Sequence, residues 1–202
     1  IVVVSSFYHS FEEFKSLYNS CCALSKNLVD DNVFYAILLD FPDSTKMSFE
    51  QEKETLNMID EFAKKERIYC RHVSLFIRKR IKEGNVYRAW ERKRGGILTL
   101  FKALLSGNYK CFSRFEKIRG VNFAILLDED SKLMPGDVKK SINVALHPAN
   151  KKTIIFSYQN RINGFSLKSN YAKRFQESSY TEIYPYGTEF YYKAFGKGIF
   201  CG

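Results

Sequence analysis

The chain of 202 residues is 45% hydrophobic, 27% charged and 16% aromatic, which is enough apolar material for one sizeable core. With only 4 Pro and 11 Gly and no visible internal repeat, the composition excludes a low-complexity or disordered chain. The net charge of +10 comes mainly from basic clusters at residues 78–82, 92–94 and 139–140, and it suits nucleic acid, an anionic membrane face or a phosphorylated substrate equally well.

Apolar β-branched runs alternate with amphipathic segments along the chain. In order, the pattern predicts a strand at Ile1–Val4, a helix at Phe11–Leu28, a strand at Val33–Leu39, a helix at Phe49–Lys65, a strand at Arg71–Ile77, a helix at Ile97–Leu105, a strand at Val121–Leu127, a helix from Pro135 to about Leu146 and a strand at Thr153–Tyr158. The aromatic segment that ends the chain fits a mobile lid or an acceptor-binding wall. Strands alternating with helices predict an α/β fold with a mostly parallel, doubly wound, Rossmann-type sheet and helices on both faces.

The cysteines and the chain ends bear on cellular setting. The five cysteines show no metal-ligand spacing and their odd number argues against a disulfide framework, so we expect reduced, mostly buried thiols in the cytosol. No apolar run approaches the roughly 18 residues of a membrane span, and no signal peptide is visible. Ile1 opens inside a strand and Gly202 follows no terminating pattern, so we expect one domain, residues 1–202, cut from a longer protein and truncated at both ends.

Two carboxylates, Asp128 and Asp130, directly follow the apolar run Val121–Leu127. Such a run predicts a strand buried on both faces, and ligands of α/β sheets bind at the carboxyl ends of such strands. Because residues i and i+2 of an extended segment point the same way, both carboxylates can converge on one hard cation that also touches a diphosphate. The alternative is a turn in which Asp130 and Ser131 cap the helix announced by Pro135.

The second predicted strand also ends on acids. Asp40 follows it and can accept the imide N–H of a uracil ring, while Pro42 turns the chain away from the sheet. The alternative is a simple strand-exit turn with helix caps at Asp43 and Ser44.

A basic loop, Glu91-Arg92-Lys93-Arg94-Gly95-Gly96, stands immediately before a predicted helix. Cations and unpaired amides at a helix N-terminus form a cradle for a diphosphate, and the glycines would allow close approach. The alternative is a solvated basic loop. Trp90, the only tryptophan, can pack under this loop, stack on a ligand or do neither.

Near the end of the chain, Glu189 stands beside aromatic residues and glycines in the segment Tyr184–Gly202. A carboxylate above an aromatic sugar-binding surface is a candidate general base. The alternative is a surface turn followed by an amphipathic helix.

The three histidines share no metal-like spacing, and neither a P-loop nor a nucleophile elbow occurs, so hydrolase and P-loop functions have no support.

Taken in order, these segments resemble the glycosyltransferase domain of cyclic β-1,2-glucan synthases over nearly the whole chain. The resemblance is carried by Phe34–Asp43, by Trp90-Glu-Arg-Lys-Arg-Gly95 with Gly107, by Ile125-Leu-Leu-Asp-Glu-Asp-Ser131 with Leu133, Pro135 and Ala145-Leu-His-Pro148, by Gln159-Asn-Arg161-Ile162, and by Tyr191–Gly202. It implies a GT-A fold and an inverting, metal-dependent transfer of glucose from UDP-glucose to a growing β-1,2-linked glucan. It also implies a parent membrane protein that holds this domain at the cytoplasmic face of the inner membrane.

The resemblance assigns roles to individual residues. Asp128 and Asp130 would hold Mg²⁺ or Mn²⁺ on the donor diphosphate, and Glu189 would be the catalytic base. The other donor-binding residues would be Asp40 at the uracil, Arg92, Lys93, Arg94 and Gly95 at the phosphates, and Asp43, Gln159 and Arg161. The expected partners are UDP-glucose, a glucan acceptor and the remaining domains of the parent, and nucleic acid is not expected.

This sequence departs from the family pattern at three places. Phe101 stands where the family usually has an amide-bearing Asn, Lys193 where it has an acid, and Gln159-Asn-Arg-Ile162 where it tends to have Q-P-R-V. These departures leave two alternatives open: a divergent branch that uses another sugar or linkage, and a non-catalytic nucleotide-sugar-binding or structural domain of a larger carbohydrate-active enzyme.

Overall fold

The computed structural model describes residues 1–26, 32–47, 50–129, 131, 133, 136–152, 187, 190, 191 and 193–196. The chain divides into two compact units, Ile1–Leu146 and His147–Gly202. The expectation of one domain over residues 1–202 stays a prediction.

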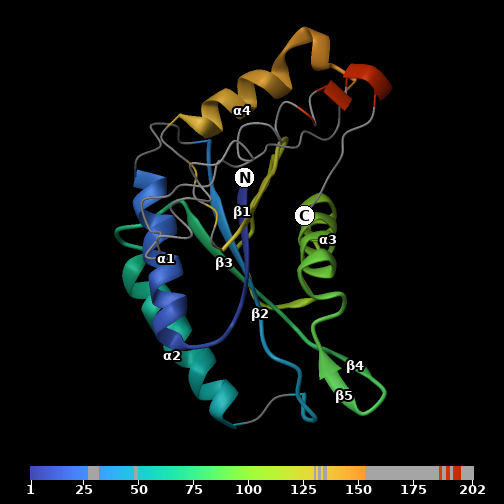
Figure 1. Cartoon of the computed structure of the whole chain (residues 1–202). Helices are drawn as coiled ribbons and strands as arrows, with labels where there is room; N and C mark the ends of the chain where they lie inside the picture. The colour runs from blue at the N-terminus through green and yellow to red at the C-terminus, as the bar shows by residue number, and fades with distance from the viewer. Residues whose placement is uncertain are drawn as a thin grey trace, which may run out of the picture. The chain divides into compact units, whose positions relative to one another are not determined.

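A five-stranded sheet lies at the centre of the first unit (Figure 1). Its strands, in spatial order, are β6 (Phe112–Arg114), β3 (Val73–Arg78), β2 (Tyr35–Asp40), β1 (Val2–Phe7) and β7 (Ile125–Asp128). β3, β2, β1 and β7 pair in parallel, and β6 is antiparallel to β3. The predicted α/β class with a mostly parallel sheet is therefore confirmed.

Helices cover both faces of this sheet, as predicted. α1 (Phe11–Lys26) and α2 (Glu50–Glu66) lie on one side and α3 (Arg92–Ser106) on the other (Figure 1). Because alternate residues of a strand point to opposite faces, Ile37 packs with α1 and α2 while Leu38 packs with α3 in a second apolar cluster. α4 (Asp137–Leu146) adds Val138 to the first cluster.

Three short strands escape prediction because each has only three residues, too few to show a period of two. They are β6 and the two strands of a separate hairpin, β4 (Ile81–Glu83) and β5 (Val86–Arg88). The hairpin holds the loop after β2, since Ser44 and Tyr87 exchange backbone hydrogen bonds of 2.9 and 2.7 Å.

The expectation that Val121–Leu127 forms a strand buried on both faces is wrong. Only its last three residues enter β7, and Leu126 remains 45% exposed. The reason is that β7 has a single neighbour, β1, within the described part of the sheet. The strand predicted at Thr153–Tyr158 lies outside the described residues.

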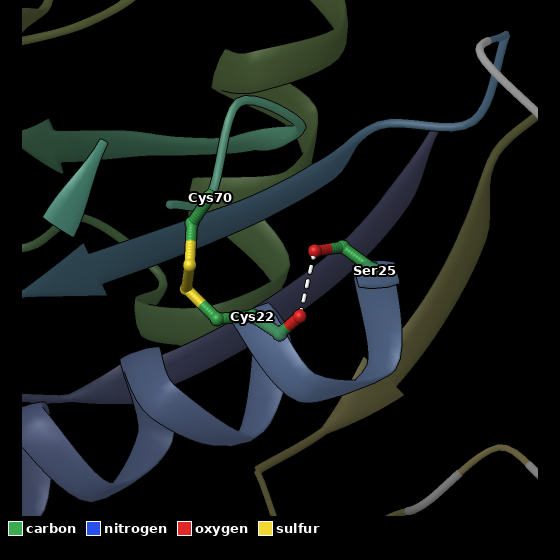
Figure 2. The surroundings of a disulfide bond; sticks show 3 residues. All are labelled: Cys22, Ser25 and Cys70. Carbon is green, nitrogen blue, oxygen red and sulfur yellow. Dashed lines mark hydrogen bonds between the residues drawn. A yellow bond between two sulfur atoms is a disulfide. The ribbon is translucent and has the colours of Figure 1, made fainter. Parts of the chain in front are cut away.

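The expectation of wholly reduced cysteines is also wrong. Cys22 of α1 and Cys70 form a disulfide, because the fold brings their Cα atoms to 5.4 Å (Figure 2). One turn later, Ser25 Oγ donates a 2.8 Å hydrogen bond to the Cys22 carbonyl oxygen, as Figure 2 shows. Cys21 is a buried thiol and Cys111 an exposed one. Because two of the cysteines are bonded, a cytosolic setting does not follow from the cysteines.

The basic cluster at residues 78–82 is not a continuous surface patch. Arg78 and Arg80 are buried, at 5% and 6% exposed, and pair with Asp40 and Glu52 respectively. A buried guanidinium with a carboxylate partner adds little to the surface potential, so the positive surface is smaller than the sequence indicates.

The described part of the second unit begins with a short 3₁₀ helix, Pro148–Asn150, capped by His147, whose Nδ1 accepts from the Ala149 amide at 3.2 Å. Near the end of the chain, Phe190, Tyr191 and residues 193–195 are helical, with Phe190 and Phe195 exposed. Among the described residues, no helix combines the length and apolar character that crossing a bilayer requires.

Candidate functional site

The candidate site lies at the carboxyl end of the parallel sheet, on the face that α3 covers. β1, β2 and β3 follow one another toward one edge, whereas β7 pairs on the opposite side of β1. This reversal of strand order between β1 and β7 is a topological switch point, where open α/β sheets bind ligands. Asp128 is the last residue of β7 and pairs in register with Ser5 of β1 at this point.

The structure brings together two predicted pieces that are far apart in the sequence. The ammonium group of Lys93, in the first turn of α3, forms an ion pair with the carboxylate of Asp128. Alternation along β7 explains the encounter, since Leu127 packs with α1 and α2 and the neighbouring Asp128 therefore points toward α3. Both side chains remain about half exposed, so a ligand from solvent can reach them.

The first turn of α3 carries three cations at the positive end of the helix dipole, and two of them, Lys93 and Arg94, pair with the carboxylates of Asp128 and Glu91. Arg92, Lys93 and Arg94 are exposed there, and no acidic residue lies in that turn. The N-terminus of a helix is the positive end of its dipole and presents unpaired amides, so three cations at that end favour binding of a negative group. A phosphate cradle at this turn stays a prediction, as does its alternative of a solvated basic loop.

The loop before α3 has a strained backbone. Glu91 and Arg92 both lie in the left-handed region, with φ of 46° and 44°. Gly95 is buried against the preceding turn. A Cβ added to Gly95 would overlap the carbonyl oxygen of Trp90 and lie 2.9 Å from both the carbonyl carbon and the ring of Trp90. Gly95 thus serves close packing of the loop on α3, and Trp90 packs over the loop while its side chain stays partly exposed.

Asp40, the predicted uracil contact, lies in a buried ion pair at the end of β2. Its two carboxylate oxygens accept hydrogen bonds of 2.8 and 2.6 Å from Nε and Nη2 of Arg78, the last residue of β3. Burial raises the pKa of the Asp40 carboxyl above its ordinary value, while the hydrogen bond and the charge of Arg78 act in the opposite direction. A uracil contact at Asp40 stays a prediction. Both carboxylate oxygens of Asp40 already accept hydrogen bonds from Arg78.

Asp43 lies farther out, beside a cavity of about 390 Å³ whose walls include Arg88, Trp90 and Arg92. Its carboxylate is 3.8 Å from Nε of Arg88. The alternative of a helix cap at Ser44 is not realised, because α2 begins only at Glu50 and the Ser44 hydroxyl accepts from the nearby Lys46 amide at 3.1 Å.

Two hydroxyls near the end of β1 lie on opposite faces of the sheet, and neither was predicted to belong to the site. Ser6 Oγ donates to Glu129 Oε2 at 2.6 Å, on the α1 side of the sheet, beside a cavity of about 340 Å³. Ser5 Oγ, next to Asp128, is buried and has no hydrogen-bond partner among the described residues. The sequence feature that could have indicated these hydroxyls is the pair of successive serines after the apolar residues of β1.

Of the two predicted metal ligands the structure describes Asp128 alone, and its carboxylate pairs with the Lys93 ammonium, so a cation held there stays a prediction. Within the described ranges no group of three His, Cys, Asp or Glu side chains could hold a metal. Mg²⁺ and Mn²⁺ nevertheless often bind through one or two carboxylates plus substrate phosphates, and an exposed carboxylate with an unpartnered hydroxyl beside it suits that mode.

Four predicted site residues, Asp130, Gln159, Arg161 and Glu189, lie outside the described residues. The alternative in which Ser131 caps the following helix is not realised, because α4 begins at Asp137 and the Ser131 amide instead donates to the Asp128 carbonyl oxygen at 3.0 Å.

Comparison with known proteins finds a distant relationship. Over 148 residues the chain is 27% identical to the cyclic β-(1,2)-glucan synthase NdvB of Rhizobium meliloti (strain 1021), a match that covers 67% of this chain and 5% of NdvB. No family model matches the chain. The chain thus corresponds to a small part of that much longer protein, and the similarity links it distantly to a glucan synthase.

Proposed function

We propose that this chain is a glycosyltransferase domain of GT-A type that moves glucose from UDP-glucose to a growing β-glucan with inversion. The observation that carries the proposal is the ion pair between Lys93 and Asp128 at the switch point, which joins a cationic helix N-terminus to a carboxylate at a strand end. The distant similarity to a β-(1,2)-glucan synthase supports the glucan and its linkage.

The proposed donor site divides the work among its residues. Lys93, Arg92 and Arg94 would neutralise the donor diphosphate at the N-terminus of α3. Asp128 and Asp130 would hold Mg²⁺ or Mn²⁺, which supplies further positive charge to the diphosphate when bound. Lys93 pairs with the Asp128 carboxylate, so donor binding would transfer the ammonium group from a carboxylate to a phosphate.

In the proposed reaction an acceptor hydroxyl attacks the anomeric carbon of glucose as the bond from that carbon to UDP breaks. Glu189 would accept the proton of the hydroxyl, and the cations of the loop would stabilise the negative charge that develops on UDP. Asp40 and Asp43 would bind the nucleoside end of the donor, with Gln159 and Arg161 as further donor contacts. The parent protein would hold the domain at the cytoplasmic face of the inner membrane.

The test is calorimetric titration of UDP and UDP-glucose into the chain, first with Mn²⁺ and then with excess EDTA. The proposal predicts binding that requires the metal and disappears in Asp128→Asn. The matched control is Glu61→Gln, an exposed carboxylate on α2, which should bind as the wild type does. Binding that survives both EDTA and Asp128→Asn would overturn the assigned site.

A non-catalytic donor-binding domain is the second candidate, and the position of Phe101 favours it. Phe101 packs against the apolar cluster between α3 and the sheet, where the resembling family usually places an amide. Donor binding without UDP release, measured in the full-length parent protein with acceptor present, would select this candidate. UDP release that depends on acceptor would exclude it.

A further inference from the structure

Arg78 binds both Asp40, at the end of β2, and the loop before α3 with one guanidinium group. Besides its two hydrogen bonds to Asp40, it donates from Nη1 to the Trp90 carbonyl oxygen at 2.8 Å and from Nη2 to the Arg92 carbonyl oxygen at 2.7 Å. The side chains of Arg78 and Asp40 are only 4% and 6% exposed. The two bonds to Asp40 are therefore shielded from water, and this bidentate pair fixes the orientation of the guanidinium.

The two carbonyls that Arg78 binds flank the strained part of the loop. Glu91 and Arg92, with φ near 45°, lie in the left-handed region. Residues with a Cβ keep this strained conformation only when the surrounding structure imposes it. No side chain caps α3 at Glu91, and the Glu91–Arg94 ion pair at 3.5 Å is exposed. The turn is held by two backbone hydrogen bonds, from the Arg92 amide to the Ala89 carbonyl oxygen at 3.0 Å and from the Gly95 amide to the Glu91 carbonyl oxygen at 3.2 Å, and by the two partly buried side-chain bonds from Arg78.

The shape of the turn decides where the next side chain goes. Lys93 follows the strained pair directly and, from the first turn of α3, reaches Asp128 on β7. If the turn relaxed, the start of α3 would rotate and the ammonium group would leave the carboxyl end of the sheet.

We propose that Arg78 is a positioning residue of the donor site, which holds the strained Glu91-Arg92 turn through two carbonyls so that Lys93 faces Asp128. The inference rests on the proposed function. Arg78 acts through the loop and through Asp40 rather than on the diphosphate. An arginine is required because a planar guanidinium can serve a carboxylate fork and two carbonyls at once, whereas a lysine ammonium cannot match that geometry.

The chain supplies a reporter and a matched control. Trp90, the only tryptophan, directly precedes the strained pair, so its emission and its quenching by acrylamide report the turn itself. Arg80 is the control, since it is a second buried arginine near the end of β3 whose hydrogen bonds go to Glu52 and to the carbonyl oxygens of Pro42 and Met47.

The experiment compares Arg78→Lys with Arg80→Lys in the whole chain. We expect Arg78→Lys to red-shift Trp90 emission, to increase its quenching, and to weaken Mn²⁺-dependent UDP binding by about tenfold or more, the scale expected for a misplaced charged contact. Arg80→Lys should leave the emission and the quenching of Trp90 unchanged, because its hydrogen bonds do not reach the turn at Glu91 and Arg92. Equal changes in the two variants, or no change in Arg78→Lys, would overturn the proposal.

Two further measurements keep the outcome decisive. If Arg78→Lys does not fold, Asp40→Asn keeps the guanidinium but weakens its carboxylate grip, and unchanged Trp90 emission in that variant would contradict the proposal. If the wild type binds no UDP, the proposed function fails, but the emission and quenching of Trp90 in Arg78→Lys and Arg80→Lys still decide whether Arg78 holds the turn.

Discussion

Substituting Gly95 with alanine tests the close packing between the basic loop and α3. A Cβ at Gly95 would overlap the Trp90 carbonyl oxygen and lie 2.9 Å from the carbonyl carbon, where carbon atoms prefer about 3.5 Å or more. The obstacle is backbone, so the start of α3 must move by about 0.6 Å or more from the turn. Gly95→Ala should therefore displace Lys93 as well as lower stability.

Gly96→Ala is the matched control, one residue along the same helix. Its Cβ would meet Leu38 Cδ2 at 3.1 Å, the end of a flexible side chain that can yield by a few tenths of an ångström. Alanine is favoured over glycine inside a helix by roughly 0.5–1 kcal/mol, which offsets this contact. Gly96→Ala should thus be nearly neutral, whereas Gly95→Ala should cost about 1–2 kcal/mol after the same gain, since overpacking typically costs about 1–3 kcal/mol.

The assay is urea unfolding followed by far-ultraviolet circular dichroism, with UDP binding measured on both variants. We expect the unfolding midpoint of Gly95→Ala to fall below that of Gly96→Ala, and only Gly95→Ala to bind UDP more weakly. Equal stabilities, or a more stable Gly95→Ala, would refute the packing account of the loop.

Three further predictions concern the scaffold and use urea unfolding. Reducing the Cys22 disulfide, which spans 48 residues of sequence, should lower the free energy of unfolding by about 3–4 kcal/mol, and no change would mean that the bond does not form. Burial raises the pKa of Tyr18 to about 12; because this lies above the unfolded value of 10, the stability from the neutral phenol is present below pH 10 and is lost as pH rises toward 12. Stability should therefore fall by about 1 kcal/mol more between pH 9 and pH 11 in the wild type than in Tyr18→Phe, and equal slopes would contradict this. Glu52→Gln should cost about 3 kcal/mol because it strands the buried guanidinium of Arg80, whereas the exposed Glu54→Gln should stay within about 0.5 kcal/mol of wild type.

The long elements could be predicted because their patterns are strong. Tyr35–Asp40 and Val73–Arg78 are buried at every position and read as apolar runs, and α1 and α2 carry clear helical periodicity. The predicted bounds of these elements lie within two residues of the observed ones. α3 begins five residues earlier than predicted, because its first turn is entirely basic and glycine residues and carries no apolar period.

What could not be predicted depends on contacts between distant segments. Nothing in the spacing of Cys22 and Cys70 reveals that α1 packs beside the turn before β3. Arg78 and Arg80 look like surface charges because their carboxylate partners lie 38 and 28 residues away in sequence, respectively. Asp40, Lys93 and Asp128 are predictable from sequence as residues at strand or helix ends, but which charge meets which follows only from strand order.

The claim that the basic loop and the end of β7 form one diphosphate site is tested most directly by the affinity for UDP of Lys93→Ala, measured calorimetrically with Mn²⁺. Lys102, exposed on the same helix, supplies the control Lys102→Ala. Loss of a charge-assisted phosphate contact should weaken binding by roughly tenfold to a hundredfold in Lys93→Ala and leave Lys102→Ala as wild type. Equal affinities in the two variants would contradict the account.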